Sequence, residues 1–226
     1  MPRLAQLLAS HRRILVLDAA STWVAVGLLR ADESAIWVQS SDEAGQGVFR
    51  GTETMLKQAG LTLDSIDAFI FCTGPGSMLG TRTVAMTLRT WLTLKARPVY
   101  SYQSLAAAGR AEWIRQPRAF TVIADARRET WHAQAVAADG VLAPLQRLPV
   151  AELPAGELVT PAHFRAWSAQ PARATECSYD LATVFAQVGD ADLFHPDPAP
   201  DAFQHESPDY KKWSAQTHSA ETAVKR

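Results

Sequence analysis

The sequence predicts an α/β protein made of two similar lobes. Two observations lead to this prediction. An apolar strand, a glycine-rich turn and an amphipathic helix follow one another at residues 66–98, and a pattern of strand, acidic residue and second strand occurs twice, about half the chain apart. A chain of 226 residues can hold two small lobes with a shared interface. We expect a first lobe at residues 1–115 and a second at residues 116–226, the latter ending in an irregular, proline-rich tail.

The strand and turn at the centre of this arrangement have a clear composition. Residues 66–72 are almost all apolar, which indicates a strand buried on both faces of a sheet. In the turn at residues 74–80 the glycines give backbone freedom, Pro75 fixes its own φ, and Ser77 can accept hydrogen bonds from the first free amides of a helix. Val84, Leu88 and Trp91 then recur at helical spacing. The pattern predicts a helix over residues 78–95.

The rest of the first lobe follows from hydrophobic periodicity. The predicted elements are strands at residues 14–17, 23–29 and 35–39, a helix at residues 48–59, a strand at residues 99–100 and a helix at residues 104–114. Residues 41–47 are expected to form a loose polar loop. Gly51 lies inside the first of these helices at a cost of up to ~1 kcal/mol relative to Ala, which suggests that another backbone or helix approaches there.

The second lobe begins again after the break at residues 115–118. An apolar strand ends at Asp125, and its partner strand opens with Thr-Trp at residues 130–131. In the first lobe the corresponding strand ends at Asp18, and Thr-Trp stands at residues 22–23. One inserted residue aligns the two segments, which indicates an internal duplication. The remaining expectations are a strand at residues 141–149, a helix at residues 179–188 and an irregular segment at residues 195–205.

Composition limits the classes of function. The 22 Lys and Arg residues against 23 Asp and Glu residues give a net charge of −1, so nucleic-acid binding would need a local basic patch or a basic partner. Cys72 and Cys177 suggest neither a disulfide framework nor a zinc site. No segment approaches the roughly 20 apolar residues of a membrane span, and residues 1–13 lack the apolar core of a secretory signal. We expect a soluble, cytoplasmic protein.

The duplicated aspartates leave two kinds of function open. Actin-like and sugar-kinase-like ATPases hold phosphates between two such turns, so an active ATPase or small-molecule kinase would use Asp18 and Asp125. Fold-level analogy does not establish that chemistry. The glycine-rich turn is no Walker loop, because no Lys-Ser/Thr follows its last glycine, and Ser77 lacks the frame of a hydrolase nucleophile. None of the six histidines is spaced as a helical metal pair. We therefore expect no metal and no cofactor, and we interpret the turn as structural.

The motif Gly-Pro-Gly-Ser-x-x-Gly-x-Arg at residues 74–82 resembles that of the TsaB (YeaZ) family. The strand ending in Asp18, the motif at residues 125–129, and Pro208 with Tyr210-Lys211 near the end are similar to the same family. The resemblance implies two actin-like (ASKHA) lobes with a shortened second lobe. It also implies a non-catalytic subunit in the synthesis of tRNA threonylcarbamoyladenosine. Such a subunit dimerises with a TsaD catalytic subunit and activates it, a TsaE ATPase joins the pair, and tRNA is contacted only through the complex.

The resemblance also implies where the partner binds. The family pairs through the helix before the glycine-rich strand and the helix after it, which map to residues 48–59 and 78–95. The residues expected at this interface are Val48, Gly51, Thr52, Met55, Gly76, Ser77, Met78, Gly80 and Arg82. Met78-Leu79 stands where the family usually has Phe-Thr. A homodimer through the same helices stays open, because an unpaired apolar face often self-associates. A peptidase, a third alternative, lacks both a metal pair and a nucleophile frame.

Overall fold

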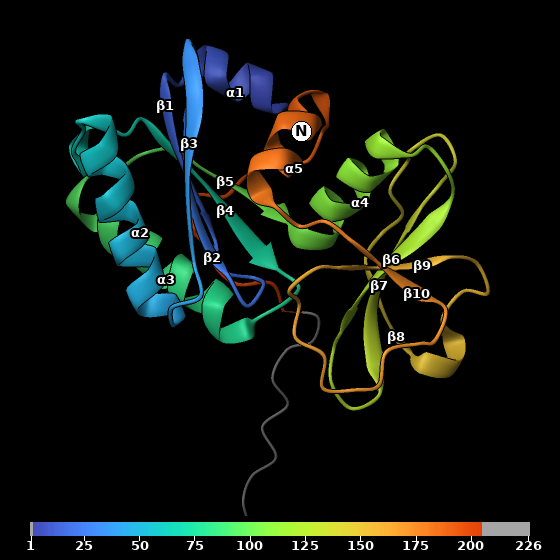
Figure 1. The fold of residues 1–226 in the computed structure, drawn as a ribbon. Helices are drawn as coiled ribbons and strands as arrows, with labels where there is room; N and C mark the ends of the chain where they lie inside the picture. The colour runs from blue at the N-terminus through green and yellow to red at the C-terminus, as the bar shows by residue number, and fades with distance from the viewer. Residues whose placement is uncertain (1, 205–226) are drawn as a thin grey trace, which may run out of the picture.

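The computed structural model describes residues 2–204, which form two lobes, each with its own β-sheet (Figure 1). The α/β class and the two-lobed organisation predicted from the sequence are confirmed. Part of the resemblance depends on Pro208 and the Tyr210-Lys211 pair, which lie outside the described residues. The same is true of His205, at the end of the segment expected to be irregular.

The first lobe is built on a six-stranded sheet in the order β11-β5-β4-β1-β2-β3. Strand β2 pairs antiparallel with β1 and with β3. Strands β4 and β5 run parallel to β1. The strands are β1 Arg13–Asp18, β2 Val24–Arg30, β3 Glu33–Ser40, β4 Ala68–Gly74, β5 Val99–Gln103 and the short β11 His195–Pro196.

The second lobe repeats this topology. Its sheet has the order β10-β9-β6-β7-β8, in which β6, β7 and β8 pair antiparallel and β9 and β10 run parallel to β6. The order and directions match those of β5-β4-β1-β2-β3, so the duplication predicted from the sequence extends to five strands. The strands are β6 Phe120–Asp125, β7 Thr130–Val136, β8 Gln146–Pro149, β9 Leu158–Pro161 and β10 Ala174–Cys177.

Helices distinguish the two lobes. In the first lobe, α2 (Ala44–Ala59) and α3 (Met78–Leu94) lie side by side on one face of the sheet, where they form the crossovers to β4 and β5 (Figure 1). In the second lobe, only the 3-10 turn η2 (Val150–Glu152) joins β8 to β9, and β9 reaches β10 through residues 162–173 without a helix. The second lobe is therefore the shortened one, as the resemblance implied.

The opposite face of the first sheet is covered by three helices. These are α1 (Leu4–Ser10), α4 (Ser104–Arg115) and α5 (Leu181–Gln187), and α4 also packs on β6 and β7 of the second lobe. Short 3-10 turns, η1 (Leu63–Ser65) and η3 (Val188–Asp190), precede β4 and follow α5. After β10 the chain thus returns to the first lobe, where α5 and β11 complete its sheet and its core.

Alternation along the central strands produces this three-layer core. Leu15 and Leu17 of β1 pack toward α2 and α3, whereas Ile14 and Val16 pack toward α1, α4 and α5. All four side chains are fully buried. Strand β4 has the same two-sided burial, which the continuous apolar run at residues 66–72 predicted.

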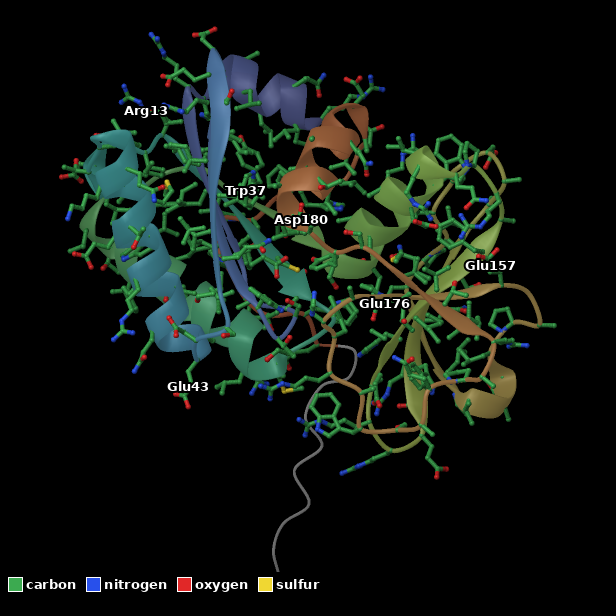
Figure 2. All side chains as sticks on the ribbon, in the orientation of Figure 1. Arg13, Trp37, Glu43, Glu157, Glu176 and Asp180 are labelled. Carbon is green, nitrogen blue, oxygen red and sulfur yellow. The ribbon has the colours of Figure 1, made fainter. Side chains whose placement is uncertain are left out.

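The N-terminus of α5 is fixed to the edge of the first sheet. Asp180 caps α5 by accepting a 3.0 Å hydrogen bond from the Thr183 amide and another of 3.0 Å from Gln39 at the end of β3. Trp37 of β3 packs against Phe185, with ring centroids 5.3 Å apart. Figure 2 shows Trp37 and Asp180 where α5 meets the sheet. These contacts hold the C-terminal part of the chain against the first lobe.

Some sequence expectations were wrong in detail. Residues 44–47, expected as loop, form the first turn of α2, and α1, β9 and β10 were not predicted. The Thr-Trp pairs do not occupy equivalent places either. Trp131 lies in β7 opposite Asp125, whereas Trp23 precedes β2, and Ala25 is the residue opposite Asp18. The duplication therefore lies in the sheet topology more than in this local alignment.

Candidate functional site

Asp18, the first candidate for phosphate or metal chemistry, is a buried structural carboxylate. It ends β1 with only 1% of its surface exposed. One carboxylate oxygen accepts a 2.8 Å hydrogen bond from the Ala20 amide. The other accepts hydrogen bonds from the hydroxyls of Tyr102, at 2.5 Å, and Tyr179, at 2.9 Å. Because a buried charge is costly unless it is hydrogen-bonded, these three donors explain how Asp18 is tolerated there.

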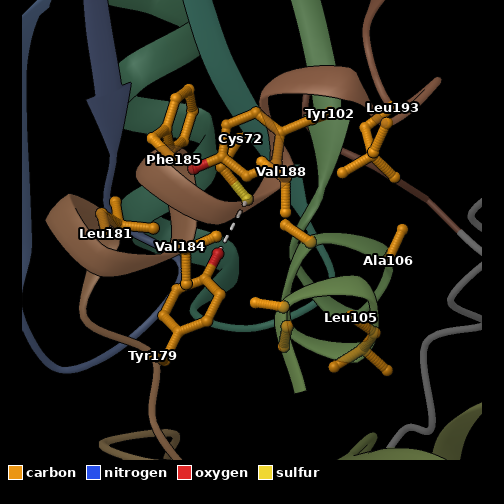
Figure 3. Close-up of a cluster of buried hydrophobic side chains, with 14 of the residues drawn as sticks. Cys72, Tyr102, Leu105, Ala106, Tyr179, Leu181, Val184, Phe185, Val188 and Leu193 are labelled. Carbon is orange, nitrogen blue, oxygen red and sulfur yellow. Dashed lines mark hydrogen bonds between the residues drawn. The ribbon is translucent and has the colours of Figure 1, made fainter. Parts of the chain in front are cut away.

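The groups around Asp18 are held in their neutral forms. Burial, and then the charge of Asp18, raise the pKa values of Tyr102 and Tyr179 well above their usual range. The same two causes raise the pKa of the Cys72 thiol. Figure 3 shows Cys72, Tyr102 and Tyr179 among apolar side chains of α4 and α5, with the Cys72 sulfur 3.9 Å from the Tyr179 hydroxyl. A neutral, buried thiol and two neutral phenols offer no nucleophile.

Asp125, the second candidate, is engaged by backbone amides. One oxygen accepts a 2.5 Å hydrogen bond from the Arg127 amide, and the other accepts from the amides of Trp167, at 2.7 Å, and Ser168, at 2.5 Å. Burial favours the protonated acid, but the backbone donors outweigh it, so the pKa of Asp125 lies below its usual value. The Arg127 guanidinium also lies over the Trp167 ring, 4.3 Å from its centroid. Asp125 therefore holds a loop of its own chain.

That loop, residues 162–168 between β9 and β10, bridges both hairpin turns. Besides its bonds to Asp125, it reaches the first turn, where the Thr22 amide donates a 2.8 Å hydrogen bond to the His163 carbonyl. The rings of Trp23 and His163 lie 5.4 Å apart. This loop therefore joins the turn that follows β1 to the turn that follows β6.

The glycine-rich turn is tied to the same region. The Ser77 amide donates a 2.7 Å hydrogen bond to the Ala20 carbonyl, and the Ser77 hydroxyl caps α3 by accepting from the Gly80 amide at 3.3 Å. The Ser104 hydroxyl donates to the Pro75 carbonyl at 2.5 Å. The predicted cap is confirmed. These bonds join the turn to the hairpin at residues 18–24 and to the start of α4.

The residues expected at the partner interface fall into two groups. Val48, Gly51, Thr52 and Met55 are buried beneath α2, facing their own sheet, so they do not form a surface. A Cβ atom at Gly51 would lie 2.9 Å from the Val26 side chain. The close neighbour inferred at Gly51 is therefore a strand of the same lobe. The helical periodicity marked the core-facing side of α2, which is a correction to the expected interface.

The expected residues of the turn and of α3 are also divided. Gly80 is buried, because α3 begins directly on the hairpin turn, and a methyl group there would collide with the Ala19 carbonyl. Gly76 and Ser77 are partly covered, whereas Met78 and Arg82 are exposed. Only the last two lie on the outer surface of α3.

The outer surface of α2 and α3 carries an apolar stripe. Exposed large apolar side chains on it are Phe49 (53% exposed), Met78 (57%), Leu79 (76%), Met86 (57%) and Leu94 (79%). Leu79, Met86 and Leu94 are spaced seven and eight residues apart, so they lie along one side of α3. Phe49 packs edge-on against Trp91, with centroids 6.1 Å apart, which connects the stripe to α2.

Threonines make this surface less polar than its sequence suggests. The hydroxyls of Thr83, Thr90 and Thr93 donate to carbonyls of α3 itself, at 2.8, 2.9 and 2.7 Å respectively. Since those hydroxyls are satisfied within the helix, their methyl groups are left to contribute to contacts with a partner. We refer to Phe49, Met78, Leu79, Met86 and Leu94 with these three threonines as the outer face of α2–α3.

Two negative findings concern the part of the chain from residue 2 to residue 204. No three His, Cys, Asp or Glu side chains in it gather closely enough to hold a metal ion. No helix in the same residues combines the length and the apolar character needed to cross a membrane.

Comparisons with known proteins identify the fold that has this geometry. The chain aligns with YeaZ from Pseudomonas aeruginosa at 18% identity and a TM-score of 0.61, covering 79% of this chain and 91% of that one. The fold is that of YeaZ. A second solved structure, of an uncharacterized protein with similarity to peptidase YEAZ from Pseudomonas aeruginosa, aligns at 18% identity with a TM-score of 0.62 and the same coverage. Residues 48–140 match the family described as TsaD, tRNA N6-adenosine threonylcarbamoyltransferase. No curated protein matches the chain in sequence.

The YeaZ fold confirms the resemblance that the glycine-rich motif indicated. The family match covers most of α2, then β4, α3, β5, α4 and the β6–β7 hairpin, and so includes that motif and the helices expected in the first lobe. Two features of the site were not predicted from the sequence. Tyr102 and Tyr179, the partners of Asp18, carry no local sequence signal of that role. Leu79 does carry a signal of its exposed apolar position, because an apolar residue stands there where the family usually has Thr.

Proposed function

We propose that this chain is a non-catalytic subunit that binds and activates a TsaD-like threonylcarbamoyl transferase acting on tRNA. The observation that carries the proposal is the exposed apolar outer face of α2–α3. It lies on a YeaZ-like scaffold whose two strand-end aspartates are engaged by the chain itself. The match to the TsaD family supports the assignment to tRNA modification.

The chemistry of the outer face suits a partner protein. Three large apolar side chains of α3, Leu79, Met86 and Leu94, are more than half exposed on one side of the helix. Several large apolar side chains exposed on one side of a helix are typical of interaction sites. Arg82 and Arg50 are exposed nearby on α3 and α2, which gives the polar rim that interfaces usually have.

In the proposed complex, the TsaD-like subunit lays its own pair of helices on this face. Binding would hold the cleft of the catalytic subunit in its active arrangement. A TsaE-like ATPase would join the pair, and tRNA would be contacted through the complex. This chain would contribute no reacting group, because Asp18, Asp125 and Cys72 are all engaged or neutral in its interior.

The competing hypothesis is an active ATPase or small-molecule kinase that uses Asp18 and Asp125. It requires both carboxylates to be available to a metal or to water, whereas each accepts three hydrogen bonds from donors of the chain itself. Calorimetry with Mg-ATP separates the hypotheses. We expect no binding in the micromolar range, and a micromolar affinity would favour the enzyme.

Reconstitution tests the proposal directly. The chain is purified with the TsaD-like protein of the same genome, and threonylcarbamoyladenosine formation is measured with a TsaE-like ATPase, tRNA and the activated precursor. We expect a stable complex and tRNA modification that depends on this chain. No complex at micromolar concentration together with no stimulation would refute the proposal. A homodimer that persists in place of the mixed complex would also count against it.

A further inference from the structure

A basic surface, separate from the outer face of α2–α3, is formed by the turn after β6 and the loop between β9 and β10. Arg127, Arg128 and Arg165 are exposed on it, and the exposed Glu129 offsets their charge only in part. Every ion pair formed within residues 2–204 involves arginines other than these three. The surface is therefore a local excess of positive charge on a chain whose formal net charge is −1.

Two residues of this surface, Arg127 and Trp167, are held as a stacked pair. The guanidinium lies 4.3 Å from the centroid of the indole ring, and Trp167 still keeps 51% of its surface exposed. Both residues are fixed through their backbones, because their amides donate hydrogen bonds of 2.5 and 2.7 Å to the Asp125 carboxylate. The exposed ring and its neighbouring charge are thus preorganised by the fold.

A second pair of exposed rings lies at the other end of the same loop. Trp23, which is 38% exposed, and the exposed His163 have ring centroids 5.4 Å apart. The 2.8 Å hydrogen bond from the Thr22 amide to the His163 carbonyl fixes this end of the loop to the first lobe. His163 and Trp167 are four residues apart in the chain, so at most about 14 Å of backbone separates the two aromatic pairs.

We infer that this surface binds single-stranded nucleic acid, with the three guanidinium groups on phosphates and Trp167 stacked on an unpaired base. Arginines beside exposed aromatic rings suit such a ligand, because every base has a π-face and the phosphates carry the charge. An acidic peptide would satisfy the arginines alone, and a duplex keeps its bases stacked on one another. The inference needs no catalytic subunit. Taken together with the proposed function, on which this last step rests, it implies that an unpaired part of the tRNA contacts this chain.

The test measures binding of labelled probes to the full chain by fluorescence anisotropy. The probes are RNA and DNA strands of one unstructured sequence of about 12 nucleotides, the same RNA annealed to its complement, and polyglutamate. We expect the single strands to bind with a Kd of about 1–100 μM, and the duplex and polyglutamate to bind at least about fivefold more weakly. A preference for RNA or for DNA supports the inference in either case and identifies the natural ligand.

Two sets of variants assign the contact. Trp167→Ala removes the ring but keeps the backbone amide, and should weaken single-strand binding by at least about fivefold, whereas Trp167→Tyr should stay within about twofold of the wild type. Arg128→Gln combined with Arg165→Gln should weaken binding by about tenfold and reduce the slope of log affinity against log salt by about 1.4. Arg12→Gln combined with Arg50→Gln removes two exposed charges of the first lobe. This matched control should keep the affinity and the salt slope of the wild type.

The thermal unfolding temperature of each variant shows that it is folded. The inference is overturned if no single strand binds at about 100 μM protein, or if the duplex or polyglutamate binds as tightly as the single strands. It is also overturned if folded Trp167→Ala binds as the wild type does, or if the Arg128 and Arg165 double variant binds as the control does. Because no catalytic subunit is present, these failures would leave the proposed function standing. A failed reconstitution with intact single-strand binding would overturn the proposed function alone.

Discussion

The hydroxyl of Tyr179 donates a 2.9 Å hydrogen bond to Asp18 Oδ2, joining two residues that are 161 positions apart. Through this bond the segment before α5 closes over the end of β1. Asp18, which the sequence offered as a candidate for phosphate or metal chemistry, is here part of the interior. Because the chain returns to the first lobe after β10, Tyr179 can reach Asp18. This contact helps to bury the Asp18 carboxylate, which is therefore not open to solvent.

Replacing Tyr179 by Phe should destabilise the fold. The change leaves the buried carboxylate of Asp18 with one donor fewer, and hydrogen bonds to charged groups contribute about 1.5–3 kcal/mol. Urea unfolding should show a loss of that size. The matched control is Tyr100→Phe, which removes a 3.0 Å hydrogen bond to His11 at a half-buried site and should cost less than about 1 kcal/mol. Equal losses in the two variants would contradict the role assigned to Asp18.

Asp125 should make stability depend on acid. Its pKa is lowered in the folded protein relative to the usual value of 3.8, so the charged form stabilises the fold above about pH 4, and that contribution is lost as the pH falls through the folded pKa. Unfolding free energies measured from about pH 6 to about pH 3 should therefore fall less steeply for Asp125→Asn than for the wild type. Asp42→Asn, at an exposed position before α2, should follow the wild type. A slope unchanged in Asp125→Asn would show that the loop at residues 162–168 is held by other contacts.

Two glycines should respond to alanine in opposite directions. Gly80 lies against the Ala19 carbonyl, so Gly80→Ala must push α3 from the hairpin turn and should cost about 1–3 kcal/mol. Gly45, in the first turn of α2, has no atom within 4 Å of an added Cβ, so Gly45→Ala should stabilise the protein by about 0.5–1 kcal/mol. Thermal unfolding compares the two. A neutral Gly80→Ala would mean that the turn and α3 are not in close contact.

Local patterns in the sequence were sufficient to predict most of the first lobe. Short apolar runs identified β1–β4, helical spacing identified α2–α4, in most cases to within a few residues, and the turn composition identified the Ser77 cap. Helix α1 also had a signal, in Leu4, Leu7 and Leu8 at helical spacing, but residues 1–13 were considered only as a possible secretory signal. Strands β9 and β10 were missed because four residues are too few to show a period.

The site was harder to predict than the fold, for a physical reason. Periodicity shows which side of a helix is apolar, but it does not show what covers that side. The resemblance pointed to α2 as a whole, and the apolar positions chosen on it, Val48, Thr52 and Met55, are covered by their own sheet. The partners of Asp18 come from β5 and from the segment before α5, so only the folded chain brings them together.

The account depends most on the outer face of α2–α3, and the affinity of the chain for its TsaD-like subunit tests it most directly. Leu79→Asp combined with Met86→Asp places two charges on exposed positions of α3, so folding should be kept while binding weakens by at least about tenfold. Val141→Asp, at a similarly exposed apolar residue of the second lobe, is the matched control and should bind as the wild type does. If the double variant binds the catalytic subunit as tightly as the wild type, this face is not the docking surface, and the central claim fails.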